Sequence, residues 1–191
     1  MDLCTYHSHC NFCDGKAPAE DFVRAAIEAG FHSYGISSHS PLPFETRWSL
    51  SKGNVEAYLM EIKCLQEKYA GQIELYVGME IDYLNDDWGP AVEYFQRMPL
   101  DYRIGSVHLV TEEQTGEIMD MDGKFEDFRE NLRMVFRDDL KYLVEAYFKA
   151  SSRMVELGGF DFVAHLDKIS MNGSLMDSTL TKQEWYNRLL W

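Results

Sequence analysis

Short apolar runs alternate along the chain with longer segments in which apolar residues recur at helical spacing. The apolar runs predict five strands, at about Leu3–Tyr6, Tyr34–Ser37, Ile73–Glu80, Tyr102–Val107 and Phe160–His165. The longer segments predict helices over about 18–28, 54–69, 87–97 and 126–157, the last of them with a break. Parallel strands with right-handed crossovers need connections of helix length, so this alternation predicts an α/β fold.

Residues that favour helix ends mark the predicted boundaries. Pro18 opens the first helix and Gly30 follows its end, whereas Asn54 suits the N-cap of the second. The first helix is expected to bury four residues at helical spacing, Phe22, Ala25, Ala26 and Ala29. The second carries an apolar side made of Val55, Leu59, Ile62 and Leu65. Each helix therefore has one face suited to packing on a sheet.

The second half of the chain carries further signals. Pro90 falls in the first turn of the third predicted helix, and Gly158-Gly159 ends the long one. The polar stretch 111–124 is expected to contain a hairpin around 114–116. A last helix starts within 178–191, with Thr179 or Thr181 as its cap.

Histidines and one glutamate gather where the predicted strands give way to turns. These residues are His7 and His9, His39, Glu80, His108 and His165. If the strands are parallel members of one barrel, these side chains meet at one face of the barrel, where the carboxyl ends of the strands lie. Imidazoles and a carboxylate converging there indicate a metal site. The alternative is that each histidine is only a polar residue at a strand edge, which six coincidences at one end of a sheet disfavour. His32 lies at the opposite end and is interpreted as structural.

Length and charge narrow the function classes. The chain has 191 residues and a mass of 22.2 kDa, which suits one domain over 1–191 but is short against the roughly 250 residues of a closed barrel of this kind. Neither a membrane span nor a signal peptide is recognisable, so a cytoplasmic protein is expected. The net charge of −14 disfavours nucleic acid as a partner. A small phosphorylated substrate stays compatible, because bound divalent cations reverse the sign of the field inside a site.

Four cysteines are present, and two of them, Cys10 and Cys13, have the spacing of a zinc knuckle or a redox motif. No second pair follows, so all four are expected to be reduced thiols. Cys10 and Cys13 are close enough to His9 in sequence to perturb the site if they were oxidised.

The order and spacing of these motifs resemble a known family. The motifs are His7-Ser8-His9, Ser38-His39-Ser40, Gly78-Met79-Glu80-Ile81-Asp82, Gly105-Ser106-Val107-His108 and Phe162-Val163-Ala164-His165. Over the whole chain they look like the polymerase and histidinol phosphatase (PHP) superfamily. The runs Tyr6–Lys16 and Ser37–Phe44 resemble the monofunctional histidinol-phosphatases within it. The resemblance implies a distorted (β/α)7 TIM-like barrel that holds two or three divalent metal ions.

Carried over residue by residue, the resemblance also implies a ligand set. His7, His9 and Glu80 hold one metal; Glu80 bridges to a second, also held by His108 and His165; His39 and Asp14 belong to a third. Such ligands suit zinc, iron or manganese, and a water shared by two cations loses a proton near neutral pH to become the nucleophile. Glu80, His108 and His165 are therefore the expected catalytic residues. For Asp14, an Asx-type turn with Gly15 is the alternative.

The chain departs from the family pattern near its end. An Asp-x-His motif normally follows a late strand, but His165 is the last histidine here, so the barrel is expected to be incomplete at its C-terminus and two metal sites each to lack one ligand. Either a longer protein has been shortened or the truncation is natural. An unpaired strand edge and the apolar residues Trp185, Leu189, Leu190 and Trp191 then favour a homo-oligomer. The alternative is a monomer whose last helix folds back.

Substrate contacts are the least defined part of the sequence. Arg47 and Lys168 are the expected phosphate-binding residues, with Arg103 and Lys16 also considered, and an ordinary surface charge is the alternative for each. Trp48, Phe44 and Phe12 could stack on an imidazole ring or simply pack under a loop.

The resemblance implies a metal-dependent phosphomonoesterase, a histidinol-phosphatase that hydrolyses L-histidinol phosphate to L-histidinol and phosphate in histidine biosynthesis. Two alternatives stay open, namely a catalytically weak metal-binding remnant and a phosphoesterase for another small phosphate ester. A nuclease-like or polymerase-associated module is disfavoured by the acidic charge and by the lack of a basic or aromatic face for nucleic acid.

Overall fold

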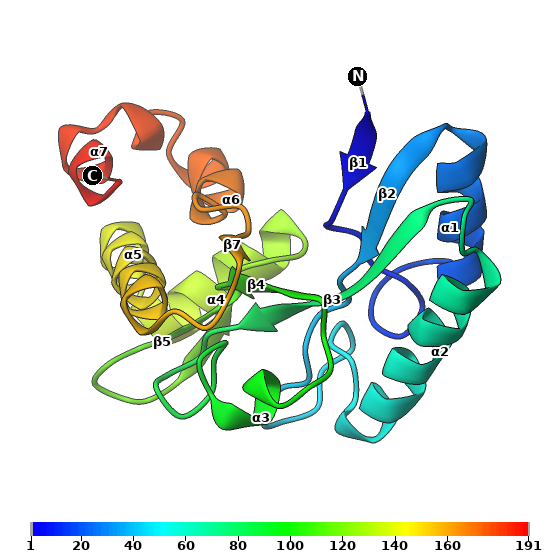
Figure 1. Cartoon of the computed structure of the whole chain (residues 1–191). Helices are drawn as coiled ribbons and strands as arrows, with labels where there is room; N and C mark the ends of the chain where they lie inside the picture. Colours follow the sequence, from blue (N-terminus) through cyan, green and yellow to red (C-terminus); the bar gives the residue numbers. More distant parts are fainter. Residues whose placement is uncertain (1, 191) are drawn as a thin grey trace. The chain divides into compact units, whose positions relative to one another are not determined.

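Five strands form one curled sheet in the order β1–β2–β3–β4–β7 in the computed structural model, which describes residues 2–190 (Figure 1). The strands are β1 Leu3–Thr5, β2 Phe31–Ile36, β3 Glu74–Asp82, β4 Tyr102–Ser106 and β7 Phe162–Val163. Strand β2 pairs in parallel with β1 and β3, and β4 pairs in parallel with β7. The parallel α/β prediction is therefore confirmed, although the fifth strand is only two residues long.

Two helices cover the strands at the start of this sheet. Helix α1 (Ala19–Glu28) packs on β2, and α2 (Val55–Lys68) packs on β3 after the short 3-10 helix η1 (Lys52–Asn54) (Figure 1). The buried face of α1 is Ala19, Val23 and Ala26. The predicted face was partly wrong, since Ala25 and Ala29 are exposed. The spacing i, i+4, i+7 from Ala19 follows the helical repeat, and the neighbouring alanines point away from it.

The third predicted helix, over 87–97, was largely wrong. Only α3 (Glu93–Gln96) is helical there. Residues before it form a tight turn in which the N–H of Trp88 donates to the carbonyl of Asn85 and the N–H of Leu84 donates to the carbonyl of Trp88. Those backbone groups are used within the turn, so the helix starts only after Pro90.

A tyrosine fills the space over two strand glycines. The Tyr102 ring lies where a Cβ at Gly35 on β2 or at Gly78 on β3 would overlap it. Its hydroxyl donates to the carbonyl of Tyr6 at 2.6 Å. Glycine is therefore required at both strand positions, and the hydroxyl fixes the chain immediately before His7.

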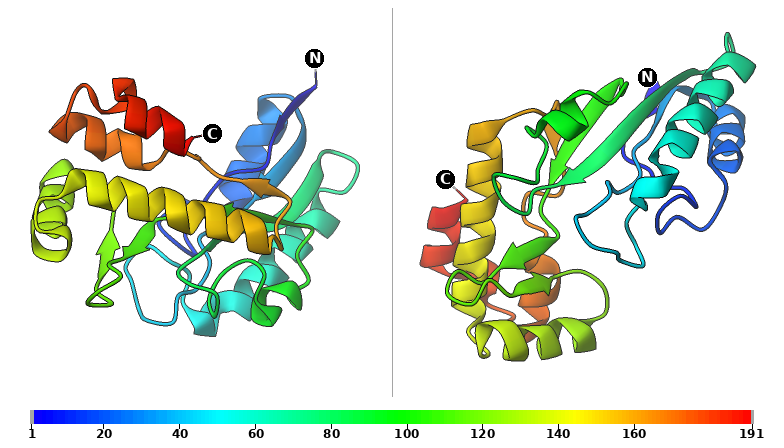
Figure 2. Two further views of the ribbon diagram at one scale, coloured as in Figure 1. Left: turned by 90° about the vertical axis from the view of Figure 1, so that its left-hand side faces the viewer. Right: turned by 90° about the horizontal axis from the view of Figure 1, so that it is seen from below.

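The remaining elements are an antiparallel hairpin and four helices. They are β5 Leu109–Thr111, β6 Ile118–Asp120, α4 Phe125–Phe136, α5 Leu140–Leu157, α6 Ile169–Met176 and α7 Glu184–Leu189, with the 3-10 helix η2 at Leu180–Lys182. Helix α5 contacts β5, α4, α6 and α7 (Figure 2). The hairpin prediction is confirmed. The predicted break in the long helix is confirmed at Arg137 and Asp138, which have positive φ of 55° and 63°.

The C-terminal segment differs from the prediction. Helix α6 was not expected, and α7 begins after Gln183 rather than at Thr179 or Thr181. Tyr186 is the buried residue of α7, with its ring 5.5 Å from that of Phe148 on α5. Of the predicted apolar stripe, Trp185 and Leu189 are half-buried and Leu190 is exposed, whereas Trp191 lies outside the described residues. The sequence pattern missed Tyr186 because its hydroxyl makes it less apolar than the neighbouring tryptophan and leucines.

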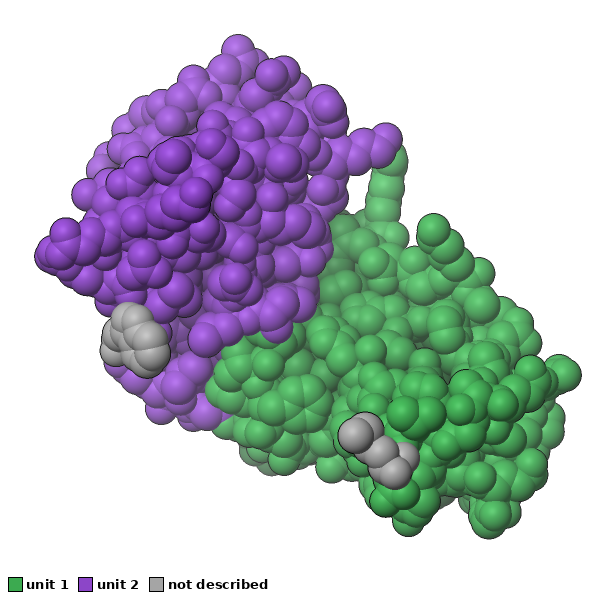
Figure 3. Space-filling model, turned by 90° about the horizontal axis from the view of Figure 1, so that it is seen from above, with its two compact units in different colours: residues 1–82, 90–105, 159–164 green, residues 83–89, 106–158, 165–191 purple. Residues whose placement is uncertain are grey.

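The described chain divides into two compact units (Figure 3). Unit 1 contains residues 2–82, 90–105 and 159–164, and unit 2 contains residues 83–89, 106–158 and 165–190. No helix among the described residues is both long enough and apolar enough to cross a bilayer.

Candidate metal centre

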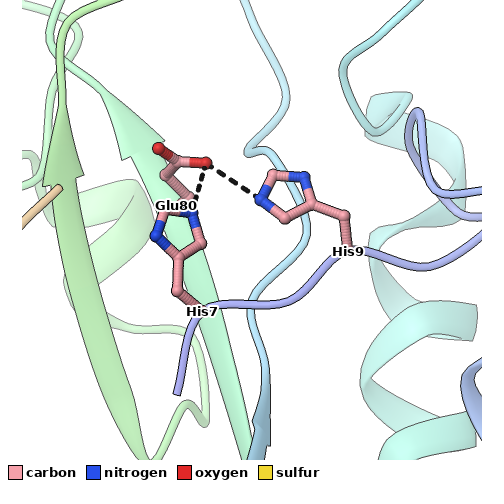
Figure 4. A group of neighbouring side chains, drawn as sticks. All are labelled: His7, His9 and Glu80. Atoms are coloured by element: carbon pink, nitrogen blue, oxygen red, sulfur yellow. Dashed lines mark ion pairs between the residues drawn. The ribbon is translucent and has the colours of Figure 1, made fainter. Parts of the chain in front are cut away.

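Two histidines and a buried glutamate meet in unit 1 (Figure 4). His7 and His9 follow β1, and Glu80 lies near the end of β3 with no exposed surface. The Nε2 atoms of His7 and His9 each lie 3.1 Å from the same oxygen, Oε2 of Glu80. Ser37 donates its N–H to the carbonyl of Ser8 at 2.8 Å, which ties this histidine segment to the chain after β2.

His39 joins the same carboxylate from the chain that follows β2. Its Nδ1 lies 3.2 Å from Oε2 of Glu80, and the two residues form a parallel β-bridge. The N–H of Glu80 donates to the carbonyl of Ser38 and the N–H of Ser40 donates to the carbonyl of Glu80. The β2–β3 pairing therefore continues to these two residues and fixes the register of His39 relative to Glu80. The Trp48 ring packs edge-on against His39, with ring centroids 4.9 Å apart.

A buried tyrosine is hydrogen-bonded to the strand segments that precede His39 and Glu80. The Tyr58 hydroxyl on α2 lies 2.9 Å from the carbonyl of Ile36 and 2.7 Å from that of Gly78. Burial raises the pKa of Tyr58 well above its ordinary value, so the hydroxyl keeps its proton for these carbonyls. The sequence reasoning missed Tyr58, although its spacing to Ile62 and Leu65 follows the buried face of α2.

Asp14 lies beside the histidines rather than apart from them. Its Oδ1 is 3.2 Å from Nδ1 of His9 and 3.9 Å from Nε2 of His39. The N–H of Gly15 donates to the carbonyl of Cys10, which closes the turn that carries Asp14. The ligand role of Asp14 stays a prediction, and its carboxylate lies next to two of the predicted histidine ligands.

Protonation in this cluster follows from its charges. Burial lowers the pKa of His9, but contacts with the Cys13 thiol and the Glu80 carboxylate outweigh burial and raise it to about 10. Burial raises the pKa of Cys13, and the contact with His9 outweighs it, so the thiol pKa lies below its ordinary value. A buried carboxylate facing three imidazole nitrogens at 3.1–3.2 Å needs positive charge between them. A divalent cation supplies it, and nitrogen and carboxylate donors suit zinc, iron or manganese.

The other two predicted ligands lie together in unit 2. The Nε2 atoms of His108 and His165 are 3.2 Å apart. Two imidazoles on one tetrahedral zinc ion have nitrogens about 3.3 Å apart, so this pair is compatible with a shared cation. Met121 donates its N–H to the carbonyl of His108, and Lys168 donates its N–H to that of His165. Both histidine segments are thus anchored through their backbones.

An ion pair links the two chain segments next to these histidines. The Nζ of Lys168 lies 2.9 Å from Oδ2 of Asp122. Asp122 was not singled out from the sequence, because the acidic stretch around it resembles any solvated loop. Asn172 is buried and donates from its Nδ2 to the carbonyl of Met121 at 3.2 Å. The loop that follows β6 is therefore held to α6 by both an ion pair and a hydrogen bond.

The basic candidates occupy different environments. Arg47 is exposed on the loop after His39. Lys168 is paired with Asp122, with 19% of its side chain exposed. The guanidinium of Arg103 donates to the carbonyls of Phe95, Gln96 and Met98, so its donors are engaged at the end of α3. Lys16 is exposed.

The remaining candidates are placed as follows. The Phe12 ring packs against Tyr58 with centroids 5.6 Å apart, and Phe44 is exposed. All four cysteines are free thiols in the structure, with Cys10 buried, Cys13 half-buried, and Cys4 and Cys64 exposed. His32 is largely exposed at the start of β2, 3.9 Å from a carboxylate oxygen of Glu74, away from the Glu80 cluster.

Curated relatives share about a quarter of the aligned sequence. A Deinococcus radiodurans protein named "Probable histidinol-phosphatase" is 26% identical over 174 residues, which cover 86% of this chain and 60% of that protein. The histidinol-phosphatase of Bacillus subtilis is 26% identical over 135 residues, covering 61% of this chain and 47% of the relative. A Schizosaccharomyces pombe protein named "Probable histidinol-phosphatase" is 29% identical over 119 residues, covering 54% and 38%. The chain thus matches at most 60% of the length of these relatives.

Two solved structures share the fold. A Listeria monocytogenes protein provisionally named a histidinol phosphatase superposes with a TM-score of 0.80 at 22% identity, covering 98% of this chain and 75% of its own. The histidinol phosphate phosphatase of Lactococcus lactis, solved with zinc, L-histidinol and phosphate, superposes with a TM-score of 0.60 at 20% identity, covering 87% and 59%. The PHP domain family matches residues 5–190. The sequence motifs, the fold and this match together show that the chain belongs to the PHP domain family.

Proposed function

We propose that this chain is a metal-dependent phosphomonoesterase that acts on L-histidinol phosphate. One observation carries the proposal, namely the buried Glu80 carboxylate with the nitrogens of His7, His9 and His39 at 3.1–3.2 Å. Buried carboxylates surrounded by imidazoles are typical of divalent metal sites. The names of the relatives and the family membership support the choice of substrate.

We infer that the site uses two to three divalent ions and that the sheet belongs to a distorted (β/α)7 barrel over a single domain. The proposed ligands are His7, His9, Asp14, His39, Glu80, His108 and His165. Their assignment rests on the family resemblance and on the local geometry within each unit. Zinc, iron and manganese all match these donors.

Divalent ions in such a site lower the pKa of a bound water and neutralise charge on a phosphoryl group. The chain contributes positioning and charge. Strand pairing holds the backbone of Glu80 beside that of His39, so the two side chains start from a fixed register. Trp48 packs against His39 and limits the movement of that ring. In our proposal Lys168 binds the phosphate of the substrate, with Asp122 holding its ammonium in place, and Arg47 is the second phosphate contact.

Phosphate release tests the proposal directly. The purified chain, supplied with manganese or zinc, should release phosphate from L-histidinol phosphate in steady state, and chelation should abolish the release. Other small phosphate esters should be hydrolysed more slowly. Metal binding without turnover of any ester would support the alternative of a catalytically weak remnant. Faster turnover of another ester would redirect the substrate assignment while leaving the hydrolase chemistry intact.

Metal analysis tests the same proposal without activity. Protein purified without chelator should contain at least one transition-metal equivalent per chain. His108→Ala should lower this content, because it removes one nitrogen of the His108–His165 pair. His32→Ala, which removes an exposed histidine outside the proposed ligand set, is the matched control. Metal-free wild-type protein, or equal metal content in His108→Ala and wild type, would contradict the proposal.

A further inference from the structure

The thiol of a cysteine lies close to two of the proposed metal ligands. The Sγ of Cys13 is 3.6 Å from Nδ1 of His9 and 3.5 Å from Oδ1 of Asp14. The third edge of this triangle, from Nδ1 of His9 to Oδ1 of Asp14, is 3.2 Å. Three different donor atoms therefore face one another on the side of the His9 ring opposite Nε2, which points to Glu80.

The edges of this triangle match those of a zinc site. Zinc binds sulfur at about 2.3 Å, and nitrogen and oxygen at about 2.0–2.2 Å, in a tetrahedral arrangement. Tetrahedral angles between such bonds put sulfur about 3.5–3.6 Å from nitrogen or oxygen, and nitrogen about 3.3–3.4 Å from oxygen. The three observed separations agree with these values within about 0.2 Å. One ion can therefore contact all three donors without rearrangement of the backbone.

The backbone turn that carries Cys13 fixes this geometry. The N–H groups of Cys13 and Gly15 both donate to the carbonyl of Cys10 at 3.1 Å. A Cβ at Gly15 would overlap the backbone of Cys10, so the turn closes this tightly only with glycine there. Cys10 itself is fully buried, and its Sγ lies 3.4 Å from the Ser38 hydroxyl. The two cysteines of the motif are therefore in different environments.

We propose that Cys13 supplies a thiolate ligand to a divalent cation that is also held by Asp14 and by Nδ1 of His9. The proposal rests on the metal-dependent function proposed above and adds a sulfur ligand that the nitrogen and oxygen set does not include. Binding releases two protons to solvent, one from the Cys13 thiol and one from Nδ1 of His9, because only a thiolate and an unprotonated ring nitrogen ligate a metal. A sulfur donor favours zinc or cobalt over manganese at this position. The His9 ring then has one nitrogen towards each cation position.

Cobalt(II) absorption tests this ligand without measuring activity. The chain is stripped of metal, kept reduced and titrated with cobalt(II) alone. We expect visible ligand-field bands together with a near-ultraviolet thiolate-to-cobalt charge-transfer band. The charge-transfer band should be lost in Cys13→Ser and kept in Cys10→Ser and in Cys64→Ser, which removes an exposed thiol. Cobalt affinity in Cys13→Ser should fall roughly tenfold or more at this position.

The outcomes separate this proposal from the proposed function. Visible bands without a charge-transfer band in wild type would overturn the Cys13 ligand and leave a nitrogen and oxygen metal site standing. A charge-transfer band that survives in Cys13→Ser would also overturn it. Absence of any cobalt bands would overturn both proposals. X-ray absorption of the zinc-loaded wild type gives a second measurement that needs no variant, and it should show a sulfur neighbour at about 2.3 Å.

Discussion

The two histidine groups of this chain are held in place by different means. In unit 1, His39 and Glu80 belong to neighbouring segments that continue the β2–β3 pairing, and one carboxylate oxygen collects three imidazole nitrogens. In unit 2, His108 and His165 follow strand ends. Met121 donates its N–H to the carbonyl of His108, and Lys168 and the Tyr147 hydroxyl donate to that of His165. The first group is part of a paired sheet, whereas the second lies in connecting segments held by hydrogen bonds from other elements.

The difference also concerns charge. The unit 1 group surrounds a buried carboxylate, so it is strongly unfavourable without a proton or a cation. The His108–His165 pair contains no carboxylate, and the nearby Asp122 is already paired with Lys168. We therefore expect the unit 1 group to bind cations more tightly, and the unit 2 pair to be more sensitive to changes in its supporting loop.

The largest expected effect comes from removing the charge of Glu80. Glu80→Gln keeps the size of the side chain but takes away the anion that three imidazoles face. The proposed phosphatase activity should fall by orders of magnitude, and metal content should fall with it, while circular dichroism stays unchanged. Glu74→Gln on the same strand, which is exposed, is the control. Near-normal turnover in Glu80→Gln would contradict the proposed metal-dependent mechanism.

The sheet beneath the unit 1 group is expected to be intolerant of a single added methyl group. Gly78→Ala places a Cβ inside the Tyr102 ring, which is buried and held by its hydrogen bond to Tyr6. Overpacking of this kind should lower the free energy of unfolding by about 1–3 kcal/mol, as measured by urea denaturation. Gly53→Ala, with open space around its Cβ, should change it by less than about 0.5 kcal/mol. Equal stability of the two variants would contradict the packing described for Tyr102.

The loop support of the unit 2 pair is tested through Asp122. Asp122→Asn removes the charge that holds Lys168, so the segments next to His108 and His165 should loosen. We expect roughly tenfold weaker metal binding at this pair, as measured by competition with a chelator, and little change at the Glu80 group. Asp127→Asn, at an exposed position on α4, is the control. Unchanged affinity in Asp122→Asn would show that backbone contacts alone suffice.

The smallest expected effect is a pH dependence confined to unit 2. Hydrogen bonds from Arg153 and Tyr83 lower the pKa of Asp86 to about 2, from an ordinary value of about 3.9. A depressed carboxylate pKa contributes stability that is fully present above about pH 4 and is lost as the pH falls towards 2. The urea concentration at the unfolding midpoint should therefore fall less steeply in Asp86→Asn than in wild type as the pH is lowered from 5 to 2. Identical slopes would contradict this assignment.

Much of the candidate site was visible in the sequence because it depends on local features. Strand ends follow from apolar runs, and five histidines and a glutamate recurring at such ends are hard to explain as isolated polar residues. His7, His9, His39 and Glu80 could be grouped on this basis, and the structure places them together. A break in the long helix was also expected, and the structure places it at Arg137 and Asp138.

Other features depended on packing between distant segments. The buried face of α1 is set by contact with β2, and propensity could not separate Val23 from Ala25. The Tyr58 hydroxyl is hydrogen-bonded to carbonyls 20 and 22 residues away in the sequence. Asp122 forms its ion pair with Lys168, 46 residues later, and the two residues meet only in the folded chain. The predicted third helix is shortened to α3 because the residues before it form a turn with backbone hydrogen bonds of its own.

The sequence by itself determined the α/β alternation, the family and the residue types that meet a metal, because periodicity, helix ends and ligand chemistry are written in short stretches. Only the tertiary structure decided which nitrogen of His9 faces Glu80 and which faces Cys13, and that three nitrogens share a single oxygen. Those choices depend on strand register and side-chain rotamers. Both are fixed by the packing of the whole sheet, so no local stretch of sequence contains them.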